Sequence, residues 1–146
     1  MTIWIRRLGA LLLATLAALV VASLAHSHFV QRELLALGTE IPWGARLGAM
    51  MRDLFGLAPA FGGIIFLALL LGFSIAGLLR RRWNIPATLA YPLAGWAALA
   101  VALFAMKLQF TFSPIAGART LAGFAAISFG GAIGGLVFAW FPRTAK

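Results

Sequence analysis

Residues 57–82 read LAPAFGGIIFLALLLGFSIAGLLRRR, and this stretch decides the fold class. Its first 23 residues carry no charge, and 13 of them are Leu, Ile or Phe. A helix of that length rises about 35 Å, enough to cross about 30 Å of hydrocarbon. Its large apolar residues favour membrane insertion by about 4–8 kcal/mol in sum. The stretch therefore predicts a membrane-spanning helix over 57–79 that ends at a cluster of arginines.

Three further stretches have the same character. We expect spans over 8–25, 86–106 and 121–141, because each is apolar and lacks Asp, Glu, Lys, Arg and His. Pro92 lies one and a half turns into the third span, so an alternative placement runs from Pro92 to Phe110. With 63% hydrophobic and 10% charged residues, the composition suits an apolar solvent. The sequence predicts an all-α, polytopic membrane protein, with residues 1–146 forming one domain, a four-transmembrane-helix bundle.

The net charge of +9 comes from basic residues placed at the ends of apolar runs. That placement favours contact with lipid headgroups and argues against nucleic acid, which needs a basic face on a soluble surface. One side of the four-span arrangement carries seven basic residues and no acid, whereas the other carries five basic residues and all three acids. The first set is Arg6, Arg7, Arg80, Arg81, Arg82, Arg143 and Lys146; the second is Arg32, Arg46, Arg52, Lys107 and Arg119, with Glu33, Glu40 and Asp53.

This asymmetry places both termini in the cytoplasm of a bacterial-type inner membrane, because basic residues in short loops stay on the cytoplasmic side. A cleaved signal peptide is the alternative for the first span, since Ser23-Leu24-Ala25 resembles a cleavage site. The apolar run of 8–25 is longer than the usual core of a signal peptide, about 7 to 15 residues, which favours a retained span. Cleavage would leave three spans in the same orientation.

The connection 26–56 is the only sizeable segment expected outside the membrane. We expect the first helix to continue past the bilayer and to stop at Gly38. A second, short amphipathic helix is expected between Pro42 and Gly56, which suit its first position and its C-terminal cap. Its apolar stripe at helical spacing is Trp43, Leu47, Met50, Met51 and Leu54. The stripe predicts a helix that lies along the outer membrane interface or caps the bundle.

Two groups of polar residues are candidates for chemistry. His26 and His28 are weak candidates for a metal or haem ligand, but on one helix their side chains point about 200° apart. The simpler interpretation is a polar end to the first span. Arg80, Arg81 and Arg82 with Trp83 are candidates for an anionic-lipid site, although orientation and anchoring alone would also require them.

The fourth span contains glycines at small-xxx-small spacing, which lets helix backbones approach closely in lipid. They are Gly123, Gly130, Gly131, Gly134 and Gly135. The motif predicts a contact helix, packed either within the bundle or against another copy or another subunit. In the third span, Tyr91, Pro92 and Gly95 form a kinked region that either packs tightly or opens a cavity.

The sequence contains no set of residues that defines a reaction. It has no cysteine, no paired carboxylates and no phosphate-binding loop, and the spans hold no ionisable residue of the kind that coupled carriers keep at depth. No cofactor or metal is predicted. We expect a non-catalytic helix-packing module, either a homo-oligomer or an accessory subunit, in contact with lipids. The alternatives are a small permeation protein for a neutral or anionic solute, and a redox, haem-linked or lipid-linked subunit that uses His26 or His28.

Overall fold

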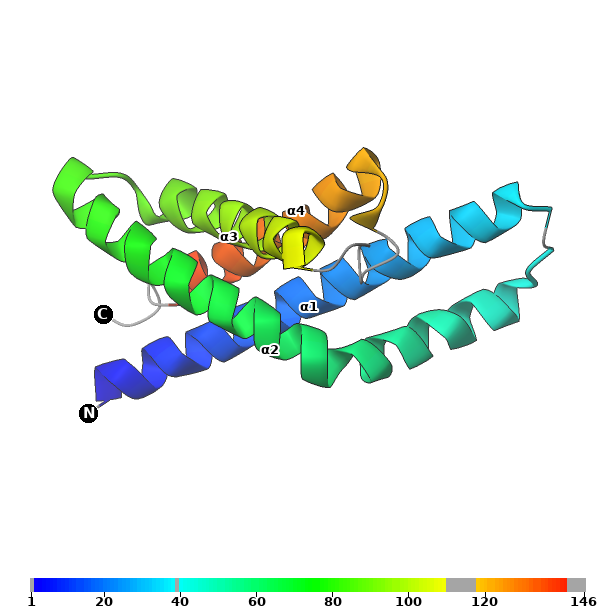
Figure 1. The fold of residues 1–146 in the computed structure, drawn as a ribbon. Helices are drawn as coiled ribbons and strands as arrows, with labels where there is room; N and C mark the ends of the chain where they lie inside the picture. Colours follow the sequence, from blue (N-terminus) through cyan, green and yellow to red (C-terminus); the bar gives the residue numbers. More distant parts are fainter. Residues whose placement is uncertain (1, 39, 110–117, 142–146) are drawn as a thin grey trace.

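A computed structural model describes residues 2–38, 40–109 and 118–141, and its main elements are four helices (Figure 1). They are α1 (Thr2–Ala36), α2 (Trp43–Trp83), α3 (Ala87–Gln109) and α4 (Leu121–Trp140). Each contains a stretch that is long and apolar enough to cross a membrane. The expected all-α class with four candidate membrane spans is confirmed.

Consecutive helices run antiparallel, and the fourth closes back on the first. Along α1 and α2, for example, Leu19 lies next to Gly62 and Ser27 next to Asp53, so residue numbers rise on one helix as they fall on the other. The starts of α1 and α3 and the ends of α2 and α4 therefore share one end of the bundle (Figure 1). We call it the arginine end, because it carries Arg6, Arg7, Arg80, Arg81 and Arg82. Arg143 and Lys146 lie outside the described residues.

The first two helices are longer than the other two and extend past them as a pair (Figure 1). We call this part, residues 26–36 of α1 with 43–57 of α2, the projecting hairpin. α1 ends as expected: Gly38 has a left-handed backbone with φ of 83°, and its N–H donates to the carbonyl of Leu35. Glycine adopts that conformation without the penalty that a Cβ brings, so it terminates the helix.

The expected helix end at Gly56 is wrong, because α2 continues through it to Trp83 as one helix of 41 residues. A single glycine inside a helix is unfavourable by only about 1 kcal/mol, less than the packing of the flanking turns on α1 can supply. Pro59 also lies inside α2, near the place where Figure 1 shows the helix bending. α3 likewise begins before Pro92, at Ala87, so the alternative start at Pro92 is wrong.

Candidate functional site

α4 approaches α1 so closely that the facing positions of α4 have no room for a side chain. A Cβ added at Gly130 would lie 2.9 Å from the carbonyl oxygen of Ala18, and one at Gly134 would lie 2.7 Å from that of Ala14. On α1, this face consists of alanines at every fourth position: Ala10, Ala14, Ala18 and Ala22, all with no exposed surface. Small residues on both helices thus create the close contact, as is common between helices in lipid.

A second face of α4 makes the same kind of contact with α3. A Cβ at Gly131 would overlap the carbonyl oxygen of Gly95, and one at Gly135 would overlap that of Tyr91. The residues of the expected kink, Tyr91, Pro92 and Gly95, are therefore packed against the backbone of α4. Gly123 is also buried, and its N–H donates to the Thr120 side chain that caps the start of α4.

The projecting hairpin is held together by polar contacts. The Ser27 hydroxyl donates to Oδ2 of Asp53 at 2.6 Å, and the Gln31 amide donates to the Arg46 carbonyl oxygen at 3.2 Å. Arg46 in turn donates from Nε to the Ile41 carbonyl oxygen and stacks over the Trp43 ring at 4.9 Å.

Two serines and a glutamine form a buried polar stripe along α1. Ser23, Ser27 and Gln31 recur at every fourth residue, and all three are buried. The Ser23 hydroxyl has no hydrogen-bond partner among the described residues, and the Ser128 hydroxyl of α4 is in the same state. The sequence shows that these polar residues recur at every fourth position. It does not show that Ser27 and Gln31 face α2.

The two histidines lie on opposite sides of α1. His26 is half-buried and within electrostatic range of Asp53, whereas His28 is exposed and touches Phe29 edge-on. Among the described residues, no group of three His, Cys, Asp or Glu side chains is placed to hold a metal ion.

The predicted amphipathic stripe is divided between two sides of α2. Met50 and Leu54 are half-buried, and Leu54 packs on the core, whereas Trp43, Leu47 and Met51 are exposed. The outward side consists of residues at helical spacing that we call the open face: the exposed Gly44, Leu47, Met51 and Phe55 and the half-buried Gly48. Phe55 is 75% exposed, and a Cβ added at Gly44 or Gly48 would meet nothing within 4 Å.

At the arginine end, the guanidinium groups lie beside aromatic rings. Arg80 is 5.9 Å from the centre of the Tyr91 ring, and Arg7 is 6.0 Å from that of Trp4. Tyr91 packs against Phe73 and Phe138, which ties α2, α3 and α4 together at this level. Arg80, Arg81, Arg82 and Trp83 are all exposed.

Comparison with protein-family models, with curated proteins and with solved structures finds no match for this chain.

Proposed function

We propose that the chain is a non-catalytic membrane module that associates with further copies of itself through the open face of α2. The observation that supports this proposal is an apolar surface on the projecting hairpin against which none of the described residues packs. Exposed apolar surface of this kind is typical of protein–protein interfaces.

The distance of this surface from the membrane favours a protein partner over lipid. The apolar stretch of α2 that we expect to span the membrane begins at Leu57, and Trp43 precedes it by 14 residues. That length corresponds to about 21 Å along the helix. The headgroup layer on one side of a bilayer is only about 5–8 Å thick. With α2 perpendicular to the bilayer, Trp43, which is 77% exposed, would lie beyond the headgroup layer, where a protein partner could reach it.

The open face suits a second copy because its five residues are uncharged and combine small with large side chains. Copies in one membrane share an orientation, so their α2 helices would meet in parallel and like residues would lie opposite one another. Arg46 and Asp53 make their contacts within the hairpin. The exposed Arg52 borders the face, where its Nε donates to the carbonyl oxygen of Gly48 at 3.3 Å. Leu47 of one copy would fit against Gly44 and Gly48 of the other.

The glycines of α4 are a poorer candidate for this contact. Gly130 and Gly134 lie against the backbone of α1, and Gly131 and Gly135 lie against that of α3. A second chain would have to displace one of these helices to use them. The open face needs no such rearrangement.

Gly48→Leu tests the proposal, with Gly63→Leu as the matched control. Both glycines lie inside α2 and have nothing within 4 Å of the added Cβ, so neither substitution disturbs packing within one copy. We expect the wild-type chain in lipid nanodiscs to be dimeric or larger by mass, Gly48→Leu to be monomeric, and Gly63→Leu to resemble wild type. A monomeric wild-type chain, or an oligomer unaffected by Gly48→Leu, would contradict self-association at this face.

Disulfide trapping gives an independent measurement, because the chain has no cysteine of its own. Met51→Cys on the open face should form a disulfide between copies under mild oxidation. His28→Cys is exposed on α1 in the same hairpin and serves as the control. Equal yields of cross-linked dimer from the two variants would count against the proposal.

A further inference from the structure

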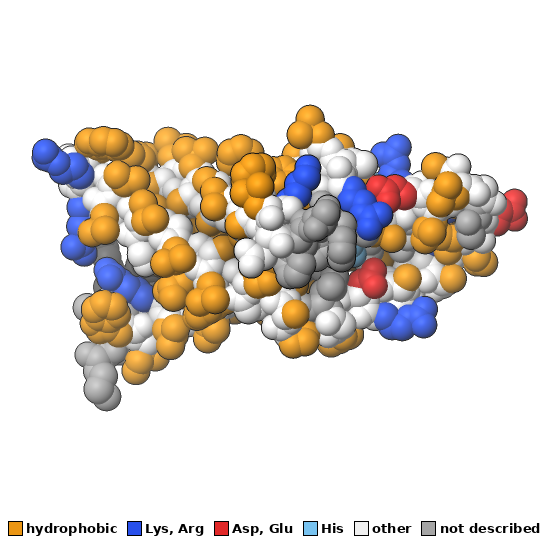
Figure 2. Space-filling model, in the orientation of Figure 1, with side chains coloured by type: hydrophobic (Ala, Val, Ile, Leu, Met, Phe, Trp, Pro, Cys, Tyr) orange, Lys and Arg blue, Asp and Glu red, His pale blue; other side chains and the backbone are white. Residues whose placement is uncertain are grey.

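The arginine end carries a high positive charge. Arg6 and Arg7 extend from the first turns of α1, and Arg80, Arg81 and Arg82 from the last turn of α2; all five are exposed. None of the described arginines or acids forms a salt bridge here, because Glu33, Glu40 and Asp53 all belong to the projecting hairpin and its tip. In Figure 2, basic side chains lie at the arginine end and also in the opposite half, whereas the acidic side chains in view lie only in the opposite half.

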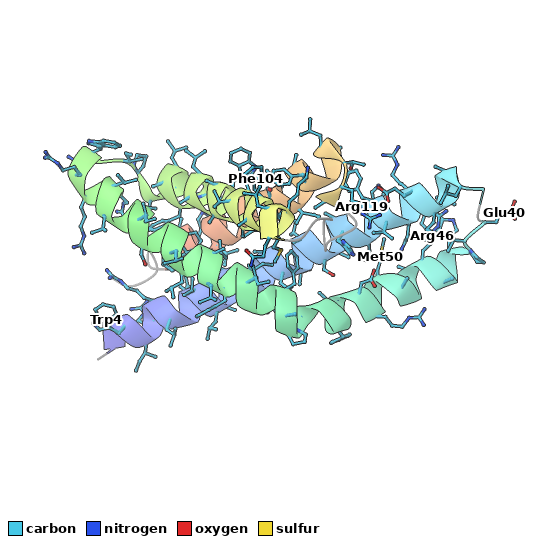
Figure 3. All side chains as sticks on the ribbon, in the orientation of Figure 1. Trp4, Glu40, Arg46, Met50, Phe104 and Arg119 are labelled. Atoms are coloured by element: carbon cyan, nitrogen blue, oxygen red, sulfur yellow. The ribbon has the colours of Figure 1, made fainter. Side chains whose placement is uncertain are left out.

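Three tryptophans mark the depth of this end relative to a bilayer. Trp4, Trp83 and Trp140 are 74%, 68% and 70% exposed, and they lie at the start of α1, the end of α2 and the end of α4. Figure 3 shows Trp4 pointing outward at the tip of α1. Tryptophan side chains concentrate at the level of lipid headgroups, where an amphipathic ring meets both acyl chains and water. Five guanidinium groups thus lie close to the level at which phosphates are found.

We propose that the arginine end binds the headgroups of anionic phospholipids, in two separate groups, one at Arg6 and Arg7 and the other at Arg80 to Arg82. Successive residues on a helix point about 100° apart, so the three arginines of α2 cannot converge on one phosphate. They contact several lipids around the edge of the bundle. Arg7 and Arg80 lie 6.0 and 5.9 Å from the ring centres of Trp4 and Tyr91, and guanidinium N–H groups bind phosphate oxygens well.

Phospholipid binding to the purified chain in a neutral detergent tests this proposal without dependence on membrane orientation. Native mass spectrometry would count bound phosphatidylglycerol against phosphatidylcholine at equal concentrations. Wild type should retain phosphatidylglycerol in clear excess, and added salt should reduce the excess. Each arginine near anionic lipid contributes about 1 kcal/mol, so Arg6→Gln/Arg7→Gln should weaken binding by roughly tenfold to thirtyfold, and Arg80→Gln/Arg81→Gln/Arg82→Gln by more.

Arg32→Gln/Arg52→Gln is the matched control, because it removes the same charge as the α1 pair from exposed positions in the projecting hairpin. It should bind phosphatidylglycerol as wild type does. Equal retention of the two lipids, or equal loss in the control, would overturn the proposal. Displacement of the lipid by inorganic phosphate or a short oligonucleotide at comparable concentration would also overturn it, because the arginines would then bind anions in general. The outcome does not depend on self-association through α2.

Discussion

At the residue scale, two glycines of α4 allow a helix contact that no other residue permits. Gly131 and Gly135 bring the α4 backbone against the carbonyl groups of Gly95 and Tyr91 on α3. Backbone atoms cannot move aside as the end of a flexible side chain can, so an added methyl group must separate the helices. Gly63 of α2, by contrast, faces open space.

We therefore predict that Gly131→Ala destabilises the bundle, by about 1–3 kcal/mol, the range typical of overpacking. Gly63→Ala should be neutral or stabilising by up to about 1 kcal/mol, because alanine favours a helix over glycine. Unfolding in mixed micelles with increasing denaturing detergent, followed by helical circular dichroism, measures both effects. Equal stability of Gly131→Ala and wild type would show that the two backbones are not in close contact.

The sequence predicted a contact helix from these glycines but not their partners. Which helix faces Gly131 depends on how the four helices are arranged, and every helix of the chain offers small residues. The alanines of α1 were a readable signal, since Ala10, Ala14, Ala18 and Ala22 recur at every fourth position. The span contains many other alanines, so a regular spacing of four of them was not recognisable as a contact face.

At the scale of elements, α2 shows why local signals misplaced a boundary. Pro42 does precede the helix, whose first residue is Trp43, but Gly56 lies inside it. Glycine is found both at helix ends and inside helices that pack closely, and only the neighbouring helix distinguishes the two cases. Here α1 continues alongside α2 well past Ala25, so α2 remains helical over the same length.

The contact between Ser27 and Asp53 is expected to hold the projecting hairpin closed. Ser27→Ala removes a short hydrogen bond to a charged acceptor and leaves the half-buried carboxylate without it, a loss of about 1.5–3 kcal/mol. We predict that backbone hydrogen exchange in residues 26–36 and 43–57 accelerates by about tenfold or more. Exchange in α3 and α4 should stay as in wild type.

Ser74→Ala is the control for this measurement. The Ser74 hydroxyl bonds only to the Leu70 carbonyl of its own helix, on an exposed side of α2. Exchange in the hairpin should therefore be unchanged. If Ser27→Ala and Ser74→Ala behave alike, the polar contact does not stabilise the hairpin.

At the scale of the whole molecule, the two ends of the bundle differ in their charged residues: the described acidic residues all lie away from the arginine end. All four helices begin or end at the arginine end, so the start of α1 and the end of α4 lie at the same end of the bundle (Figure 1). The sequence predicted this alternation because the four apolar runs are distinct and their basic flanks are short. It could not predict that α1 and α2 remain paired outside the bundle, since that depends on the hydrogen bonds between them.

We predict that the arginine end lies in the cytoplasm and that Arg80, Arg81 and Arg82 determine this orientation. With single cysteines in a chain that has none, Leu37→Cys should react with a membrane-impermeant thiol reagent in intact cells, and Trp83→Cys only after permeabilisation. Changing the three arginines to Gln lowers the basic count on that side from seven to four, against five on the other. Because the side with more Lys and Arg in short loops stays inside, a substantial fraction of this variant should then invert and expose position 83. Labelling of Trp83→Cys in intact cells with the three arginines present would contradict the predicted orientation. If position 83 stays protected from the reagent after the arginines are changed to Gln, other residues determine the orientation.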